Sequence, residues 1–379
     1  MAAADDRRFM RRALELAAAG WGRVHPNPMV GAVVVRDGVV VGEGYHTAFG
    51  APHAEVEALR AAGGRARGAT VYVTLEPCAH HGKTPPCTEA LAKAGVARVV
   101  FAAEDPGAEA GGGGAWLRAA GVEVTAGVER AAARRQNAAF FHALERPGCY
   151  VALKYGMSLD GRLSRRGGER MTVTGPESHA EVHRLRAGFD AIMVGGETAR
   201  VDDPLLTVRG GVTPIRPPAR VVLDPGATLD PGSRLVRTAR DAPVIVVMAA
   251  AGQQAARRRG ALEDAGVHVL ETGSGEGGLD LAGTLERLRA EGIQSVLCEG
   301  GGRLGSALLA AGLVQRLYLF MAPELYGGGV PAFPSVGRRI TGVTVDVQRY
   351  GDDVLLVVDL DEPEPDGGTA EVEAAAGIG

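Results

Sequence analysis

Cysteine is scarce in this sequence: the chain has four cysteines among 379 residues. Four are too few for a disulfide scaffold, so we expect a reducing, cytoplasmic environment, in which clustered cysteines indicate a metal site or catalysis. Long apolar runs are also lacking, because no segment reaches the roughly 18 residues that a membrane span requires. The first ten residues, MAAADDRRFM, include acidic side chains and no apolar core, so we expect no secretory signal.

The chain also lacks an excess of positive charge. The formal net charge is −4, so no overall basic field draws the protein to nucleic acid or to a membrane surface. What the chain does have is apolar material for sizeable cores: 46% of its residues are hydrophobic and 23% are charged. A length of 379 residues exceeds what one hydrophobic core usually serves, so we expect two domains.

Helix and strand patterns alternate over the first 145 residues. Residues 6–19 carry apolar side chains at helical spacing. Two apolar runs flank Asp37-Gly38, which predicts a β-hairpin. The stretch ATVYVTL, residues 69–75, predicts a strand, and TEALAKAG predicts a helix that ends at Gly95.

A Pro147-Gly148 pair predicts a domain boundary. We expect one domain over 1–146, a second over 147–360, and a disordered tail over 361–379, where the sequence is acidic, rich in Pro and Gly, and then rich in Ala. Helical segments separate most of the strands predicted in the second domain, which favours an α/β sheet covered on both faces. Those strands lie near 149–155, 190–194, 220–223, 243–248, 266–270 and 295–299.

Four residues of the first domain predict a catalytic zinc site. His53, Cys78 and Cys87 supply one nitrogen and two sulfur ligands, which leaves the fourth position of a catalytic zinc to water. Glu55, at the start of a predicted helix, can reach that water without binding the metal and can carry its proton to a leaving nitrogen. The order matches the zinc deaminase signature H-x-E…P-C-x-x-C, except that eight residues separate the cysteines instead of two. A structural zinc site with His80 or His81 as the fourth ligand is the alternative.

Several longer stretches resemble the bifunctional deaminase-reductase family of riboflavin biosynthesis, from about residue 9 to about residue 330. The deaminase half of that family is similar to HPNPMVGAVVV, GEGYH, PHAEVEAL, YVTLEPCAHHGKTPPC and ALAKAGVARVVFAAEDP. The reductase half is similar to LKYGMSLDGRL, VHRLRAGFDAIMVGGETARVDDPLLTVR, RVVLD and CEGGGRLGSALLAAGLV. The eight-residue insertion between the cysteines belongs to this family's pattern.

The resemblance implies the fold, the reactions and the cofactors. It implies an N-terminal cytidine deaminase-like α/β/α domain and a C-terminal dihydrofolate reductase-like α/β domain. The first would use Zn²⁺ to hydrolyse an amino group from a diaminohydroxypyrimidine that carries a phosphoribosylamino group. The second would use NADPH to reduce the ribosyl chain to ribityl. The partner would be this small molecule rather than nucleic acid or membrane, and we expect a homo-oligomer.

The second domain contains its own constellation. Gly300, Gly302 and Gly305 follow a predicted strand and open a helix, the context in which backbone amides approach a pyrophosphate. The resemblance implies that the cofactor contacts Gly156, Thr172, Thr198, Asp202, Gly301, Gly302, Arg303, Leu304 and Gly305. It implies that the substrate contacts Lys154, Arg170, Arg186, Leu206, Arg209 and Glu299 in this domain, and Asn27 in the pocket of the deaminase half. Arginine suits a phosphate because its guanidinium donates two parallel hydrogen bonds.

Two departures from the family pattern bear on these expectations. Where the family has a Ser and a Trp, this chain reads GGERMTVTG, with Arg170 and Thr172 in that stretch. DPGA replaces the family's DPNP at residues 105–108. The departures leave open a deaminase with an inactive reductase half. Because the zinc motif is shared with other proteins, a nucleic-acid deaminase with an accessory domain and a zinc module without catalysis also stay open.

Overall fold

The computed structural model describes residues 2–81, 85–107, 111–166, 171–211, 213–249, 252–275, 278–337 and 339–360. These residues form two compact units. The N-terminal unit comprises 2–20 and 29–137, and the C-terminal unit comprises 21–28 and 138–360. The boundary between 146 and 147 stays a prediction, and the predicted tail over 361–379 lies outside the described residues.

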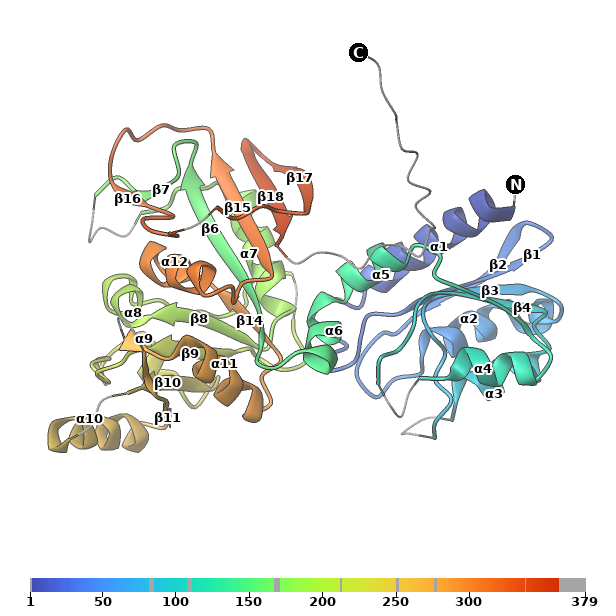
Figure 1. Ribbon diagram of the computed structural model, residues 1–379, viewed down its shortest axis with the longest axis horizontal. Helices are drawn as coiled ribbons and strands as arrows, with labels where there is room; N and C mark the ends of the chain where they lie inside the picture. Colours follow the sequence, from blue (N-terminus) through green and yellow to red (C-terminus); the bar gives the residue numbers. More distant parts are fainter. Residues whose placement is uncertain are drawn as a thin grey trace, which may run out of the picture. The chain divides into compact units, whose positions relative to one another are not determined.

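The N-terminal unit is a five-stranded sheet in the order β2-β1-β3-β4-β5 (Figure 1). Strand β1 pairs antiparallel with β2 and β3, whereas β3, β4 and β5 run parallel. The strands are β1 (Gly31–Arg36), β2 (Val39–Tyr45), β3 (Thr70–Leu75), β4 (Arg98–Ala103) and β5 (Glu123–Ala126). The helical segments are α1 (Ala2–Ala18), α2 (Ala54–Ala62), η1 (Gly63–Ala66), α3 (Cys87–Ala94), α4 (Gly113–Ala119) and α5 (Arg130–Gln136).

Alternating side chains along the strands explain why helices cover both faces of this sheet. Ala32 and Val34 of β1 join a core with α2, α3 and α4, while the apolar face of α1 packs on the other side. Gly31 lets α1 approach β1 closely, since a Cβ at this position would lie 2.0 Å from the Ala13 carbonyl oxygen. The hairpin at Asp37-Gly38 and the helix that ends at Gly95 are confirmed.

The C-terminal unit contains a nine-stranded sheet in the order β11-β10-β9-β8-β14-β6-β15-β18-β17. The strands from β11 to β15 in that order run parallel, and β18 and β17 are antiparallel to their neighbours. The strands are β6 (Tyr150–Ser158), β8 (Ala191–Gly195), β9 (Ala219–Leu223), β10 (Val244–Met248), β11 (His268–Glu271), β14 (Ser295–Cys298), β15 (Arg316–Ala322), β17 (Thr344–Tyr350) and β18 (Asp353–Asp359). Two short pairs lie outside the sheet: β7 (Arg162–Ser164) with β16 (Val330–Pro331), and β12 (Ser274–Gly275) with β13 (Gly278–Leu279).

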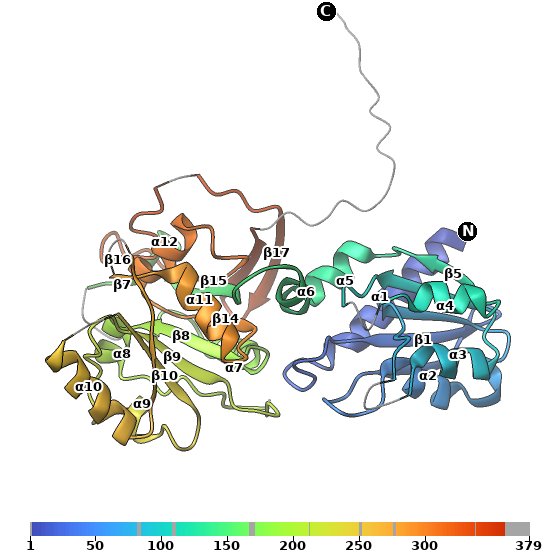
Figure 2. The same ribbon diagram turned by 60° about the horizontal axis from the view of Figure 1, so that its bottom comes forward.

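Two helix layers cover this sheet (Figure 2). The first comprises α7 (Pro176–Ala187), α8 (Gly196–Asp202), α9 (Arg234–Arg237) and α10 (Gln253–Asp264), which pack on side chains such as Ile192 and Leu297. The second comprises α11 (Leu281–Ala290) and α12 (Gly302–Ala310), which pack on the alternate residues Met193 and Val296. Helix α6 (Ala138–Glu145) precedes β6. The predicted α/β sheet with helices on both faces is therefore confirmed.

The six strands predicted in the second domain all exist, as β6, β8, β9, β10, β11 and β14. Strands β15, β17 and β18 were not predicted from the sequence. Their signals are the apolar run RLYLFMA and two alternating stretches around Gly351, which has the positive φ of a tight turn. Among the helices of the described ranges, none combines the length and the apolar character needed to cross a membrane.

A short segment near the N-terminus, 21–28, belongs to the C-terminal unit. The Trp21 indole nitrogen donates to the Arg184 carbonyl oxygen at 2.7 Å, and the Trp21 ring meets the Phe189 ring edge-on at 6.2 Å. Gly188 makes room for this ring, because a Cβ there would lie 2.1 Å from it. His25 Nε2 lies 2.7 Å from the Asp190 carboxylate. These contacts fix the segment to α7 and to the turn that follows it.

Candidate active sites

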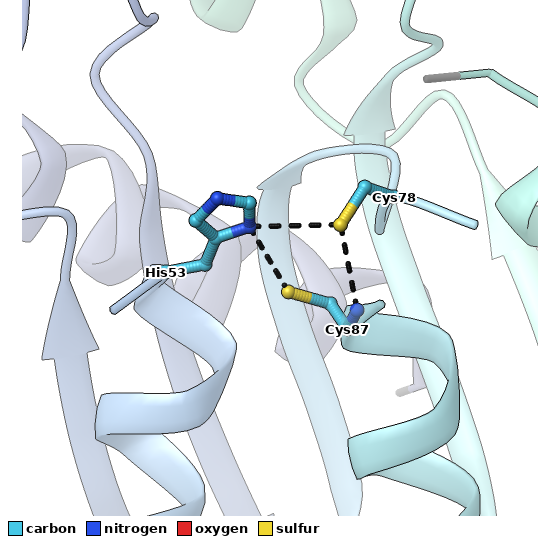
Figure 3. A group of neighbouring side chains, drawn as sticks. All are labelled: His53, Cys78 and Cys87. Carbon is cyan, nitrogen blue, oxygen red and sulfur yellow. Dashed lines mark hydrogen bonds between the residues drawn. The ribbon is translucent and has the colours of Figure 1, made fainter. Parts of the chain in front are cut away.

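Three different elements bring the predicted zinc ligands together (Figure 3). His53 caps the start of α2, Cys78 follows β3, and Cys87 is the first residue of α3. His53 Nδ1 lies 3.2 Å from Cys87 Sγ and 3.6 Å from Cys78 Sγ. The three ligand atoms all lie within 4.8 Å of one another. The predicted group is therefore assembled in space despite its separation in sequence.

This geometry fits a zinc ion. Bond lengths of about 2.0–2.1 Å to nitrogen and 2.3 Å to sulfur, in a tetrahedron, separate the two ligand atoms by about 3.5 Å. The observed distances of 3.2 and 3.6 Å bracket this value. One imidazole and two thiol groups form a donor set that suits zinc, and three protein ligands leave one position open.

The two thiols differ in acidity. A hydrogen bond with Cys87, and further bonds from the Cys87 amide and His53, lower the pKa of Cys78 to about 4 against its burial. The hydrogen bond to Cys78, together with burial, raises the pKa of Cys87. The Cys87 backbone amide donates to Cys78 Sγ at 3.4 Å. This amide at the start of α3 therefore favours the Cys78 thiolate.

Glu55 is the second residue of α2 and lies in its first turn, beside the ligand group but outside it. Its side chain is buried, with 4% exposure, and burial raises its pKa. The carboxyl group interacts with the Cys87 thiol. A buried carboxyl group of raised pKa next to an open metal position can accept and return a proton, which matches the predicted role.

Residues that no sequence motif singled out hold the loops around this site. The Glu76 carboxylate accepts from the Gly114 amide at 2.8 Å and from the Asp105 amide at 3.3 Å. A Cβ at Gly113 would lie 1.7 Å from the Pro77 carbonyl oxygen, so only glycine lets α4 approach the turn before Cys78. The available signal was Glu76 itself, a carboxylate that directly precedes Pro-Cys at the end of a strand.

The other residues considered for the deaminase site stand as follows. In the described chain, neither His80 nor His81 joins the metal-ligand group, and His81 pairs with Glu89 at 3.1 Å. The interpretation as a four-ligand structural zinc site therefore loses support. The Asn27 amide donates to the Val24 carbonyl at 2.9 Å in the turn of segment 21–28. Its contact with substrate stays a prediction.

A cavity of about 1390 Å³ opens in the C-terminal unit at the carboxyl ends of β6, β8 and β14. Ligands of open α/β sheets bind at this edge, where the connections diverge. The cavity brings together most of the residues predicted for the second constellation. Those that line it are Lys154, Gly156, Thr172, Arg186, Thr198, Asp202, Leu206, Arg209, Glu299, Gly301, Gly302, Arg303 and Leu304. Arg170 lies outside the described residues.

Arg186 and Glu299, which both line the cavity, form an ion pair. Arg186 donates to the two Glu299 oxygens at 2.7 and 2.9 Å and to the Thr207 carbonyl at 2.9 Å. Burial alone would raise the pKa of Glu299, but the charge and hydrogen bonds of Arg186, and the charge of Lys154, bring it to about 2. Arg186 thus has a carboxylate partner within the protein, and its contact with a substrate phosphate stays a prediction.

Lys154 adds a second cation to this site. Burial lowers the pKa of its ammonium group, Glu299 raises it and Arg186 lowers it further. Its Nζ lies 5.8 Å from the centre of the Phe320 ring. A buried ammonium group with a lowered pKa, beside a fixed carboxylate, suits proton transfer in the cavity.

The start of α12, where cofactor contacts are predicted, lines the cavity and packs closely on neighbouring elements. The Gly301 amide donates to Thr198 Oγ1 at 3.1 Å, which links α12 to α8. A Cβ at Gly302 would lie 2.4 Å from the Pro331 carbonyl oxygen, so a larger residue would clash with the backbone at Pro331. Gly305 lies one turn further, where a Cβ would meet the Tyr155 hydroxyl at 1.9 Å. Gly305 therefore lets α12 pack on β6, and its contact with cofactor stays a prediction.

The cavity also contains residues of α7 that were not predicted. His179, Val182 and His183 line it together with Arg186. Their spacing of three, four and seven residues from His179 places them on one face of a helix, so this pattern was visible in the sequence. Burial lowers the pKa of both histidines.

Comparison with known proteins supports both sites. Residues 3–103 match the model of the cytidine and deoxycytidylate deaminase zinc-binding region, and residues 149–356 match the RibD C-terminal domain. The riboflavin biosynthesis protein RibD of Escherichia coli is 41% identical over 93% of this chain and 98% of its own length. The corresponding protein of Aquifex aeolicus is 41% identical over 93% of this chain and 97% of its own length.

Two solved structures have the same overall organisation. RibD of Acinetobacter baumannii, form 1, superposes with a TM-score of 0.81 at 36% identity and covers 95% of this chain and 100% of its own. A Thermotoga maritima protein described as a diaminohydroxyphosphoribosylaminopyrimidine deaminase and 5-amino-6-(5-phosphoribosylamino)uracil reductase superposes with a TM-score of 0.80 at 32% identity. It covers 95% of this chain and 100% of its own.

The fold and the two sites define a two-domain enzyme in which a zinc-dependent deaminase is joined to an NADPH-dependent reductase. More narrowly, the chain belongs to the RibD family of riboflavin biosynthesis proteins. Its cofactors are zinc and NADPH, and it acts on a small molecule. The predicted fold class is confirmed, with a cytidine deaminase-like N-terminal domain and a reductase C-terminal domain.

Proposed function

We propose that the two halves act in succession on one pyrimidine. The first replaces an amino group of diaminohydroxyphosphoribosylaminopyrimidine by oxygen and releases ammonia. The second reduces the ribosyl chain of the product to ribityl with NADPH. The observation that carries the proposal is the assembly of both predicted residue sets, one around His53, Cys78 and Cys87 and one around a single cavity.

In the deaminase half, zinc bound to His53, Cys78 and Cys87 would supply a Lewis acid that makes water a nucleophile. Glu55 takes a proton from that water and delivers it to the leaving nitrogen. One C–O bond forms, one C–N bond breaks, and ammonia leaves. The raised pKa of the buried Glu55 carboxyl supports this exchange, because the group can hold the proton between the two steps.

In the reductase half, NADPH would supply the reducing equivalents for the first ribosyl carbon. Thr198, Asp202 and the first turn of α12 are proposed to hold the cofactor. Arg209 and Leu206 are proposed to hold the substrate, and Arg186 to fix Glu299. Lys154 is proposed to donate the proton that ring opening requires, since it lines the cavity and its ammonium group interacts with the charge of Glu299.

The full chain, purified with zinc, tests this proposal when it receives the diaminopyrimidine substrate and NADPH. We expect ammonia release, followed by NADPH oxidation in an equal amount. Ammonia release without NADPH oxidation would leave a deaminase with an inactive reductase half. Neither reaction on this substrate, together with ammonia release from an RNA or DNA oligonucleotide, would favour the nucleic-acid deaminase instead.

Two further expectations belong with this proposal. We propose that the protein is cytoplasmic, because its cysteines are few: Cys78 and Cys87 are predicted zinc ligands, and Cys149 and Cys298 are buried. We also propose a homo-oligomer, because β17 is an edge strand whose Val345 and Val347 are exposed. Light scattering of the purified chain measures the assembly state.

A further inference from the structure

The stretch DDPLLTVR, residues 202–209, forms one wall of the C-terminal cavity. Its residues divide between two roles. Asp202, Pro204, Leu206 and Arg209 line the cavity. The Asp203 carboxylate and several backbone groups of the stretch bond instead to neighbouring parts of the protein, namely α7, α9 and Arg220. The wall therefore has cavity-lining residues and an anchored side, whose groups bond to neighbouring elements.

The first anchor is Asp203. Its Oδ1 accepts a hydrogen bond from the Arg234 backbone amide, at the first residue of α9, at 2.8 Å. The Arg234 side chain returns a longer bond to the Asp203 carbonyl at 3.4 Å. Asp203 does not line the cavity, so its carboxylate serves the wall and not the ligand.

Three more bonds continue the anchored side. Arg220, which is fully buried, donates to the Leu205 carbonyl at 3.4 Å. The Thr207 carbonyl accepts from Arg186 at 2.9 Å. At the end of the wall, the Arg209 backbone amide donates to His183 Nδ1 at 3.2 Å. The backbone is thus tied down at intervals along the whole stretch.

The wall needs these ties because part of it is strained. Asp203 has φ 37° and Leu206 has φ 51°, both in the left-handed region. Asp tolerates that region better than most residues, whereas a branched side chain such as Leu rarely enters it. Such conformations persist where the surrounding structure holds them, and Leu206 is held among buried side chains with 4% exposure. Leu206 thus belongs to the buried core and also lines the cavity.

We propose that Asp203 is a positioning residue of the reductase: its bond to the Arg234 amide holds the wall in the left-handed conformation that presents Leu206 and Arg209 to the substrate. The proposal rests on the proposed function, because it assumes that this cavity binds the pyrimidine. A ligand that needs a preformed wall binds more weakly as the fraction of molecules with a formed wall falls, because its apparent Kd is the intrinsic Kd divided by that fraction.

The test separates the side-chain anchor from the backbone conformation. Asp203→Asn keeps an acceptor oxygen and tolerates the left-handed region, whereas Asp203→Gly tolerates the region but has no acceptor. Asp37→Ala is a matched control, because Asp37 also has a positive φ of 52° but sits in the β1–β2 hairpin with its side chain 93% exposed. Each full chain is assayed for NADPH oxidation on the deaminated pyrimidine, for ammonia release, and for hydrogen exchange of residues 203–209.

We expect Asp203→Gly to raise the KM for the deaminated pyrimidine about tenfold with kcat within about twofold, and to speed hydrogen exchange of the wall. Asp203→Asn and Asp37→Ala should match the wild-type KM, and every variant should release ammonia at the wild-type rate. A wild-type KM for Asp203→Gly, or an Asn variant as impaired as Gly, would overturn the proposal. The unmodified chain tests the proposed function separately. If it did not oxidise NADPH, the proposed function itself would be refuted.

Discussion

At the scale of single residues, both sites depend on charged groups that the fold has removed from water. Glu55 is buried, and this burial outweighs the opposing charge of His53, so its pKa is raised. Glu299 is buried against Arg186, and its pKa falls to about 2. The raised pKa lets the first carboxyl hold a proton more readily, whereas the second stays ionised. Both residues are glutamates, so it is the surroundings of each carboxyl group that shift the two pKa values in opposite directions.

Glu55→Gln should abolish deamination. Glutamine preserves the shape of the side chain but cannot carry the proton, so we expect ammonia release to fall by about 10²- to 10⁴-fold. Zinc content, measured by atomic absorption, should stay at one ion per chain, because His53, Cys78 and Cys87 are unchanged. Glu57→Gln, in the same turn of α2, should leave activity unaltered. Loss of zinc from the Glu55 variant would mean that the carboxylate serves the metal site and not the proton.

Arg186→Lys should make the reductase sensitive to acid. Burial raises the pKa of Glu299, and Arg186 outweighs it with two hydrogen bonds and a charge. Lysine cannot make both bonds, so the pKa of Glu299 should rise by about one unit or more. The acid limb of the pH profile of NADPH oxidation should move to higher pH by the same amount. Arg184→Lys is the matched control, since Arg184 pairs with Glu181 at 2.7 Å on the same helix.

The same pair also affects stability, and the sign follows from the lowered pKa. A carboxyl group with a pKa of about 2 in the folded protein and about 4.3 in the unfolded chain stabilises the fold above the higher value. That contribution is lost as the pH falls from about 4 towards 2. The melting temperature of the wild type should therefore fall between pH 5 and 3. In Arg186→Lys this fall should be smaller. An unchanged acid limb in the variant would contradict the role of Arg186.

At the scale of elements, the sites lie where strands end and helices begin. His53, Cys78 and Cys87 occupy a helix start, a strand exit and a second helix start. Glu299 follows β14, and Gly302 opens α12. Parallel strands place their carboxyl ends at one edge, so residues far apart in sequence converge there. The positions of the sites follow from the direction of the strands.

This convergence explains what the sequence could predict. The zinc group was predictable because metal coordination restricts the residue types and because helix and strand signals placed each ligand at the end of an element. The wall anchors were not, since Arg220 reaches Leu205 through a contact 15 residues away that follows no motif. The strands β15, β17 and β18 were missed because the recognisable motifs end near residue 330. Their alternating pattern was present in VDVQRY and DVLLVVD.

Gly302→Ala should weaken cofactor binding. The new Cβ would lie 2.4 Å from the Pro331 carbonyl oxygen, so the first turn of α12 or the β16 strand must shift. We expect the Kd for NADP⁺, measured by fluorescence titration, to rise about tenfold or more, because phosphate binding at a helix start depends on well-defined amide positions. Gly260→Ala, in α10 with nothing within 4 Å of the new Cβ, should leave the Kd unchanged. Equal affinities of the two variants would argue that the cofactor does not bind at α12.

At the scale of the whole molecule, the order of the sequence and the division into units differ. Residues 21–28 precede the deaminase sheet in sequence, yet they pack within the C-terminal unit through Trp21 and His25. A shortened chain that ends near residue 146 would therefore separate this segment from its packing partners. Each half is expected to have its own stabilising ligand, because zinc binds the N-terminal unit and NADP⁺ the C-terminal unit.

Those ligands allow the last prediction to be tested on the intact chain. NADP⁺ should raise the melting temperature of one unfolding transition, and a zinc chelator should lower that of the other. Trp21→Ala removes the indole contacts with Arg184, Gly188 and Phe189. Residue 21 lies within the deaminase sequence. We nevertheless expect the variant to destabilise the unit whose unfolding transition NADP⁺ stabilises, and to lower its free energy of unfolding by about 2 kcal/mol or more.

The chain's other tryptophan supplies the control. Trp116 lies on α4 of the N-terminal unit and is 39% exposed, so Trp116→Ala should affect only the transition that the chelator lowers, and by less. Differential scanning calorimetry with each ligand assigns the two transitions before the variants are compared. If Trp21→Ala lowered the melting temperature of only the zinc-dependent transition, residues 21–28 would stabilise the deaminase half. A chain that ends near residue 146 would then keep its stability.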